Sequence, residues 1–311
     1  MSEESVNIIF IHRGANDYLK FSLAQAHKSN PRANIFLIGD NGNRNISDFV
    51  KHYNIDDYFA SALKLENVYQ HFSCNSVEFE LFCIQRWFVL LDFIKANKIE
   101  KFFYADSDVL IFSDLAREWS KFSNFSFTLS SGACGHNSFW NSSLVLEDFC
   151  NFVMVVYDKK DEVGYREIVD CGQSYMLKNK AGGVCDMTFF RFYKKRFPKI
   201  IGETAGIIDD STYDDNFSSK IQNDIEYRTI FGAKKIYWRS GLPYGKDSQG
   251  KLIRFNTLHL QGNKKRFISQ ISQGQNVYAW RTFGKDKIIA LSQKLGLLDF
   301  FIKLKKYLIK K

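Results

Sequence analysis

The chain has 311 residues, of which 45% are hydrophobic and 16% aromatic, and this composition excludes a largely disordered protein. Lysine and arginine number 43 against 34 aspartates and glutamates, a balance that favours anionic partners such as phosphates, nucleic acid or an acidic membrane surface. No stretch predicts a membrane-spanning helix, because the most apolar one, residues 77–97, carries charges at Glu78, Glu80, Arg86 and Asp92.

Cysteine usage predicts a reducing compartment. The six cysteines are scattered and form no C-x-x-C pair, so a zinc site has little support. They are Cys74, Cys83, Cys134, Cys150, Cys171 and Cys185. No basic segment followed by an apolar one opens the chain, so we expect no signal peptide and a cytoplasmic location.

Strands alternate with helices in the first third of the chain. The predicted elements are a buried strand at 6–14, a helix at 17–28, a buried strand at 34–43, a short helix at 47–54 capped by Ser47, a long helix at 76–97 and a strand at 100–108. This alternation is typical of βαβ units. We therefore expect an α/β fold with a mostly parallel central sheet.

The second half of the chain is more irregular. It predicts a strand at 125–131, helices at 141–160 and 186–197, and strands joined by a Gly- and Asp-rich turn at 234–262. We expect residues 1–285 to form a single domain. Residues 286–311 predict a basic amphipathic helix, for which we favour peripheral contact with an anionic membrane surface over packing on the domain.

Two carboxylates interrupt the apolar stretch FFYADSDVLIF, residues 102–112. Side chains two positions apart on an extended chain point to the same side, so Asp106 and Asp108 can converge on one point. In parallel sheets ligands bind beyond the carboxyl ends of the strands, and Asp106 lies at such an end. A divalent cation would relieve the repulsion between the two carboxylates. The alternative is a pair of loop aspartates that cap the next turn.

This stretch resembles the DxD strand of the GT-A glycosyltransferases, enzymes that use nucleotide-diphosphate sugars, and especially that of the glycogenin and lipopolysaccharide galactosyltransferase group. The resemblance implies a Rossmann-like GT-A domain. It also implies that Asp106 and Asp108 bind Mn²⁺ or Mg²⁺, and that Asp106 and Ser107 contact the donor.

A second motif, HLQGNKK at 259–265, fits the H-x-x-G-x-x-K pattern of the same group. The resemblance implies that His259 is a third metal ligand, that the backbone of Gly262 approaches the diphosphate, and that Lys265 binds the phosphates. The group's Pro-Trp after the lysine is replaced here by Arg266-Phe267, which makes Lys264 a credible substitute for Lys265. Taken alone, His259 would be an ordinary strand histidine.

Further residues match weaker parts of the family pattern, and each has a structural alternative. Arg86 would touch the donor sugar or phosphate, or be a salt-bridged helix residue. The expected nucleoside contacts are Arg13, Gly14, Asn16 and Asp40, although Asn16 could simply cap a helix. Asp186 is the first candidate for a catalytic or acceptor-orienting carboxylate, or else an N-cap. Its weaker rivals are Asp170 and Gln173. We expect a polar loop to contain Asp209, Asp210, Asp214 and Asp215, one of which could contact sugar hydroxyls.

The sequence thus predicts a metal-dependent hexosyltransferase that moves a sugar, with UDP-sugar favoured as donor, to a glycan or lipid-linked acceptor. The late His-Gly-Lys motif resembles that of retaining enzymes, and this resemblance implies retention of configuration. Two alternatives remain: a HAD-type phosphatase that uses Asp106 and Asp108, and a non-catalytic sugar-binding protein. No motif supports nucleic acid as a partner.

Overall fold

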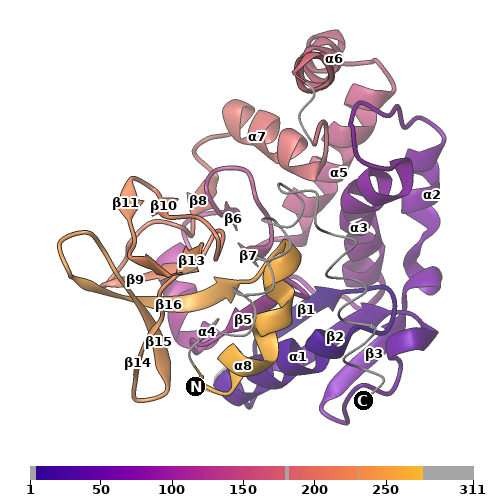
Figure 1. Ribbon diagram of the computed structural model, residues 1–311. Coiled ribbons are helices and arrows are strands. Elements are labelled where there is room, and N and C mark those ends of the chain that lie inside the picture. Colours follow the sequence, from indigo (N-terminus) through magenta and orange to yellow (C-terminus); the bar gives the residue numbers. More distant parts are fainter. Residues whose placement is uncertain (1–4, 179–181, 231, 276–311) are drawn as a thin grey trace, which may run out of the picture.

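The computed structural model describes residues 5–178, 182–230 and 232–275 (Figure 1). The helices among them are α1 (Asp17–Ser29), α2 (Ala60–Glu66), α3 (Val77–Ala96), α4 (Leu115–Glu118), α5 (Ser143–Tyr157), α6 (Glu162–Leu177), α7 (Asp186–Arg196) and α8 (Ile268–Ser272). Short 3₁₀ helices are η1 (Asn41–Asn43), η2 (Ile55–Tyr58), η3 (Trp119–Phe122) and η4 (Gly262–Phe267).

The main sheet has the strand order β3-β2-β1-β4-β7-β6-β8. Its strands are β1 (Asn7–Ile11), β2 (Asn34–Gly39), β3 (Val50–Asn54), β4 (Phe102–Asp106), β6 (Phe127–Leu129), β7 (Asn137–Trp140) and β8 (Ile201–Glu203). Strands β3, β2, β1 and β4 run parallel, and only β7 runs antiparallel to its neighbours. The predicted α/β fold with a mostly parallel central sheet is confirmed.

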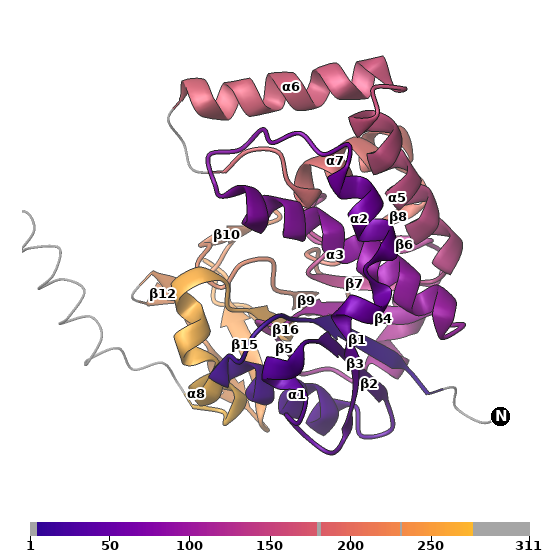
Figure 2. The same ribbon diagram turned by 90° about the vertical axis from the view of Figure 1, so that its right-hand side faces the viewer.

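Helices cover both faces of this sheet, because alternate residues of its buried strands point to opposite sides. Ile9 and Ile11 of β1 join a core with α3, α5 and α7, whereas Ile8 and Phe10 join a core with α1 and α4. The predicted long helix is confirmed as α3, whose N-cap Ser76 accepts a hydrogen bond from the backbone N–H of Phe79. Figure 2 shows α3 inside the molecule, with α6 beyond it at the edge.

A second sheet brings the late part of the chain to the carboxyl edge of the first. It contains β5 (Val109–Ile111), β9 (Ser211–Tyr213), β14 (Tyr237–Arg239), β15 (Leu242–Lys246) and β16 (Leu252–His259). The antiparallel register of β16 with β5 sets His259 opposite Val109. Two short hairpins, β10 (Ile221–Gln222) with β11 (Ile225–Glu226) and β12 (Thr229–Ile230) with β13 (Ala233–Lys234), lie beside it (Figure 1). The last residue of β16 therefore comes next to the end of β4.

The helix predicted at 47–54 is wrong, and Ser47 caps nothing there. Residues 50–54 form β3, which pairs in parallel with β2 from Val50 to Asn54. The partner strand satisfies the backbone of this segment, so tertiary pairing overrides a weak local helix preference. Its half-buried residues suit an edge strand.

The other elements predicted between residues 6 and 262 are confirmed in type, with ends shifted by a few residues. The helices α2, α4, α6 and α8 and the strands β5, β7, β8, β9, β10, β11 and β12 were not predicted. The amphipathic helix predicted at 286–311 lies outside the described residues. Within the described part of the chain, no helix is long and apolar enough to span a membrane.

Candidate functional site

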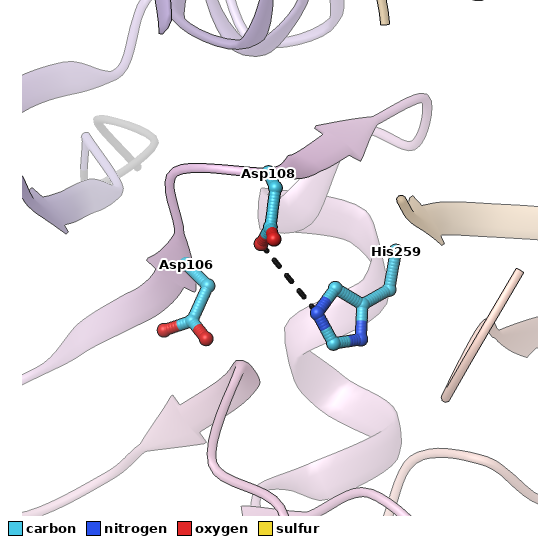
Figure 3. A group of neighbouring side chains, drawn as sticks. All are labelled: Asp106, Asp108 and His259. Carbon is cyan, nitrogen blue, oxygen red and sulfur yellow. Dashed lines mark ion pairs between the residues drawn. The ribbon is translucent and has the colours of Figure 1, made fainter. Parts of the chain in front are cut away.

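Asp106, Asp108 and His259 converge at the carboxyl edge of the main sheet (Figure 3). Asp106 is the last residue of β4, in register with Ile11 at the end of β1. The chain turns at Ser107 and Asp108 before β5 begins, and His259 ends β16 on the other side. One ligand atom from each of the three side chains lies within 4.8 Å of the others. The sheet registers therefore assemble the three predicted metal ligands.

Asp106 is fixed by two neighbours. Its Oδ1 accepts a hydrogen bond from Nη1 of Arg86 at 2.6 Å and another from the hydroxyl of Tyr104 at 2.9 Å. Since both donors bind Oδ1, Oδ2 is the oxygen of Asp106 that a cation would meet. Arg86 comes from α3 and Tyr104 from β4 itself. Tyr104 was missed by sequence reasoning, which read it only as part of an apolar strand.

Arg86 links Asp106 to Asp186 at the start of α7. Its Nη2 donates to Oδ2 of Asp186 at 2.6 Å, and Trp87 Nε1 donates to the same oxygen at 3.0 Å. Burial would lower the pKa of Arg86, but the two carboxylates outweigh it and hold the pKa well above its usual value. The arginine is thus salt-bridged and lies against a predicted metal ligand, and its contact with the donor stays a prediction.

Asp108 faces two cationic groups. Its Oδ1 lies 3.5 Å from Nε2 of His259, and its Oδ2 lies 3.2 Å from Nζ of Lys265. Burial would raise the pKa of Asp108, but His259 and Lys265 outweigh it and hold the pKa well below its usual range. Burial would lower the pKa of His259, but Asp108 outweighs it and raises the pKa to about 9. Without a cation, Asp108 and His259 form a buried ion pair.

His259 is held from behind by Asp214 and Asp215. Its backbone N–H donates to Oδ2 of Asp214 at 2.9 Å, and its Nδ1 lies 2.8 Å from the carbonyl oxygen of Asp215. A carbonyl oxygen only accepts, so Nδ1 carries a proton and Nε2 is the nitrogen aimed at Asp108. The ring of His136 stacks on that of His259 with centroids 3.9 Å apart. These contacts select Nε2 as the nitrogen that a cation would meet.

The donor set fits a divalent cation. Two carboxylates and one imidazole suit Mn²⁺, whereas Mg²⁺ prefers oxygen ligands throughout. An octahedral ion with these three protein ligands keeps positions open for water or phosphate oxygens. The arrangement can therefore hold a metal together with a phosphate-containing ligand.

The loop after β1 forms one wall next to these ligands. Gly14, with φ +85°, donates its N–H to Oδ2 of Asp40 at 2.6 Å, so the ends of β1 and β2 are tied together. The guanidinium of Arg13 lies between the rings of Phe59 and Phe82, at 4.8 and 4.4 Å from their centroids. The Arg13 side chain is therefore held by two aromatic rings.

His12 connects this loop to the middle residue of the DxD motif. Its Nδ1 lies 2.9 Å from Oγ of Ser107, and its Nε2 lies 2.9 Å from Nδ2 of Asn16. Asn16 has no side-chain capping bond to α1, so it orients His12 instead. Burial and the nearby charge of Lys265 lower the pKa of His12, which keeps the ring neutral. A polar residue closing an apolar strand was the only sequence signal for His12.

The motif at 259–265 continues into η4, which carries Gly262, Lys264 and Lys265. Gly262 has φ +60°, a conformation that favours glycine. The Nζ of Lys265 lies 5.4 Å from the ring centroid of Tyr18 and also contacts Asp108. Lys264 is half-buried one position earlier. Lys265 therefore reaches the carboxylate group.

Other predicted residues do not join the group. Gln173 and Asp170 are exposed on α6, a helix at the edge of the molecule in both views (Figures 1 and 2). Asp209 and Asp210 are surface residues that pair with lysines, Lys121 and Lys251. By contrast, Asp214 and Asp215 lie directly behind His259, where sequence reasoning had placed only a polar loop.

Comparison with known proteins returned solved structures alone. No protein-family model and no curated protein sequence matches this chain. Among the similar structures is mouse xyloside xylosyltransferase 1 in its apo form, with 11% identity, a TM-score of 0.45, and coverage of 64% of this chain and 85% of that one.

Two others are the glycosyltransferase GlyE of Streptococcus pneumoniae TIGR4 and an active-site mutant of LgtC, each 11% identical. The GlyE match has a TM-score of 0.33 and covers 66% of this chain but 45% of GlyE. The LgtC match has a TM-score of 0.44 and covers 89% of this chain and 99% of LgtC. The names of the xylosyltransferase and of GlyE describe glycosyltransferases, the class that the motifs resemble. At this identity and TM-score, the similarity assigns no activity to this chain.

Proposed function

We propose that this protein is a metal-dependent glycosyltransferase that takes a sugar from a nucleotide-diphosphate donor, with UDP-sugar favoured. One observation carries the proposal: Asp106, Asp108 and His259 converge at the carboxyl edge of the sheet, with the ammonium group of Lys265 on Asp108. A cation held by carboxylates beside a lysine is suited to a diphosphate, because the cation and the lysine would both neutralise its negative charge.

Each residue of the group has a part in this reaction. Asp106, Asp108 and His259 would hold Mn²⁺ or Mg²⁺, and a bound divalent cation stabilises the negative charge of the departing nucleoside diphosphate. Lys265 neutralises the phosphates from the other side, with Lys264 as its substitute. Gly262 lets the backbone approach the diphosphate.

The loop after β1 would hold the nucleoside. Arg13, already held between two aromatic rings, can present its guanidinium to the base or ribose. Gly14, Asn16 and Asp40 shape the same wall, and Ser107, oriented by His12, faces the donor together with Asp106.

Retention of configuration is favoured by the environment of Asp186. Its carboxylate is buried and accepts from Arg86, from Trp87 and from its neighbour's backbone N–H. A carboxylate with so many donors is better suited to orient groups than to remove a proton from an acceptor hydroxyl. The bond from the sugar to the diphosphate would break, a bond to the acceptor oxygen would form on the same face, and the acceptor proton would pass to a departing phosphate oxygen.

The phosphatase alternative fits less well. A HAD-type enzyme would need Asp106 as a free nucleophile, whereas its Oδ1 accepts two hydrogen bonds at 2.6 and 2.9 Å. It would also leave His259 without a role.

Gln173, exposed on α6, is the weakest of the predicted catalytic residues.

The acceptor we propose is a glycan or a lipid-linked saccharide. Contact of residues 286–311 with an anionic membrane stays a prediction, to be tested by vesicle binding of the full chain against a variant lacking these residues.

Calorimetry with UDP tests the proposal directly. UDP should bind wild-type protein in the presence of Mn²⁺ and lose most of that affinity with EDTA, in Asp108→Ala or in His259→Ala. Asp158→Ala, which removes a surface carboxylate paired with Lys160, is the matched control and should leave UDP binding unchanged. A hydrolysis screen over nucleotide sugars then identifies the base and sugar.

Two outcomes would point elsewhere. Phosphate-ester hydrolysis that survives His259→Ala and is lost in Asp106→Asn would establish the phosphatase. Nucleotide-sugar binding with neither hydrolysis nor transfer, across a panel of acceptors, would establish a non-catalytic binder.

A further inference from the structure

Lys234 is a fully buried lysine in the region behind the metal ligands. It ends β13, and its side chain has no exposed surface. Its Nζ donates to Oδ1 of Asp214 at 2.5 Å, to Oε1 of Gln222 at 2.7 Å and to Oδ1 of Asp215 at 3.3 Å. An ammonium group has three N–H donors, and three oxygens receive them. Moving an ammonium ion out of water costs free energy, so we expect this buried lysine to have a role that offsets the cost.

Two of the three partners of Lys234 are the residues that hold His259. Asp214 accepts from Lys234 through one carboxylate oxygen and from the backbone N–H of His259 through the other. Asp215 accepts from Lys234 through its side chain and from Nδ1 of His259 through its carbonyl oxygen. Lys234 therefore touches both groups that fix the backbone and the ring of His259.

The third partner stiffens the same segment. Gln222 receives Lys234 on Oε1 and donates through Nε2 to the carbonyl oxygen of Tyr213 at 2.9 Å and to Oγ1 of Thr212 at 2.9 Å. The backbone N–H of Lys234 also donates to the carbonyl oxygen of Phe217, at 2.8 Å. The chain from residue 212 to 217 is thus tied to Lys234 at several points.

We propose that Lys234 is a positioning residue for the metal centre, which sets the orientation of His259 through Asp214 and Asp215. In the described part of the chain, Lys234 contacts neither Asp106 nor Asp108. It acts only through Asp214 and Asp215, which hold the imidazole of His259. The inference rests on the proposed metal-binding function and assigns a partner beyond the direct ligands. Outer residues that orient a ligating histidine typically change metal affinity by about 10- to 100-fold when mutated.

The direction of the effect distinguishes positioning from simple charge. Removing a positive charge near a cation site removes Coulomb repulsion, and this effect alone would strengthen binding of the cation. Loss of positioning weakens it. Lys234→Met therefore gives opposite results under the two explanations, and Lys235→Met, the same substitution at an exposed neighbour, is the matched control.

The experiment is titration of the full chain with Mn²⁺ alone, followed by electron paramagnetic resonance. We expect Lys234→Met to bind Mn²⁺ about 10- to 100-fold more weakly than wild type, and Lys235→Met to stay within about twofold. Spin-echo modulation from a ligating imidazole nitrogen should be present in wild type and Lys235→Met and reduced in Lys234→Met. Unchanged or tighter binding with full modulation in Lys234→Met overturns the proposal.

A charge-balanced variant covers the case in which Lys234→Met does not fold. Lys234→Met combined with Asp214→Asn removes the two opposite charges that are fully buried, leaves the partly exposed carboxylate of Asp215, and keeps an acceptor for the backbone N–H of His259. We expect it to fold and still to bind Mn²⁺ at least about 10-fold more weakly. Wild-type affinity in this variant would also overturn the proposal.

A metal-free measurement separates this inference from the proposed function. If wild type binds no Mn²⁺, the proposed function fails, but the hydrogen bond from Nδ1 of His259 to Asp215 can still be followed by NMR of the ring N–H in apo protein. Loss or an upfield shift of that resonance in the charge-balanced variant, but not in Lys235→Met, supports positioning. An unchanged resonance contradicts it.

Discussion

Oδ1 of Asp108 lies 3.5 Å from Nε2 of His259, so two atoms that we assign to a cation are paired with each other when no cation is bound. The pairing raises the pKa of His259 to about 9 and holds that of Asp108 well below its usual range. A cation can bind Nε2 only after the proton on that atom has left. Binding of a cation at this site would therefore be coupled to release of a proton.

The first prediction is that Mn²⁺ affinity rises with pH. Below the His259 pKa of about 9, each bound ion displaces about one proton, so the association constant should rise about tenfold per pH unit between about pH 6.5 and 8.5. Calorimetry in two buffers with different ionisation enthalpies measures the released proton. His259→Gln should bind weakly with a much flatter pH dependence, and a flat profile in wild type would contradict the coupling.

The same pair predicts how the metal-free protein responds to pH. The folded pKa of His259 lies above its ordinary value of 6.5, so its stabilising contribution is complete below about pH 6.5 and is lost as the pH rises through about 9. The shift corresponds to about 3 kcal/mol of unfolding free energy. Asp108, with its lowered pKa, loses its contribution only in acid.

Urea unfolding in EDTA at about pH 6.5 and about pH 9.5 checks this value. Between these two conditions, wild type should lose about 3 kcal/mol more than His259→Gln, which lacks the titrating group. Equal losses in the two proteins would show that the ion pair does not stabilise the fold.

Short-range patterns predicted the parts of the site that lie on one segment. Asp106 and Asp108 could be predicted because two-residue spacing on a strand end places them on one side. His259 and Lys265 followed from the resemblance of the two motifs, in this order, to the family pattern. The segment at 47–54 was misread because its structure depends on pairing with β2, a contact between distant residues that local preference does not encode.

The residues that support the ligands could not be predicted, because each acts across the fold. Lys234, at the end of β13, meets Asp214, which follows β9, only in the folded chain, and nothing in the local sequence marks either as buried. Tyr104 looked like one more apolar strand residue, although its hydroxyl reaches Asp106. Asp170 and Gln173, predicted as weaker rivals of Asp186, are exposed on α6, a helix that was not predicted.

Arg86 should be essential to the stability of the fold. Arg86→Met would leave the carboxylates of Asp106 and Asp186 facing each other without the cation that now binds both at 2.6 Å. Arg86 and Asp106 are partly exposed and Asp186 is buried, so the loss should lie near the lower end of the about 3–5 kcal/mol typical of a buried ion pair. Arg117→Met is the matched control, because Arg117 pairs with Asp114 at the surface and should change stability by no more than about 1 kcal/mol. Urea unfolding of the three proteins gives the comparison, and similar small losses in both variants would contradict a structural bridge.

Lys265→Met should change two affinities in opposite directions. In the metal-free state Lys265 Nζ lies 3.2 Å from Oδ2 of Asp108, where it competes with a cation for the same carboxylate. Its removal should therefore tighten binding of Mn²⁺ alone by a few-fold. Affinity for UDP in the presence of Mn²⁺ should instead fall by about 10- to 100-fold, because a charge-assisted hydrogen bond to phosphate contributes about 1.5–3 kcal/mol.

Lys251→Met, which removes an exposed lysine paired with Asp210, should change neither affinity. Two changes in the same direction for Lys265→Met would mean that this lysine serves the carboxylate rather than the phosphate, and Lys264 would then take the phosphate role.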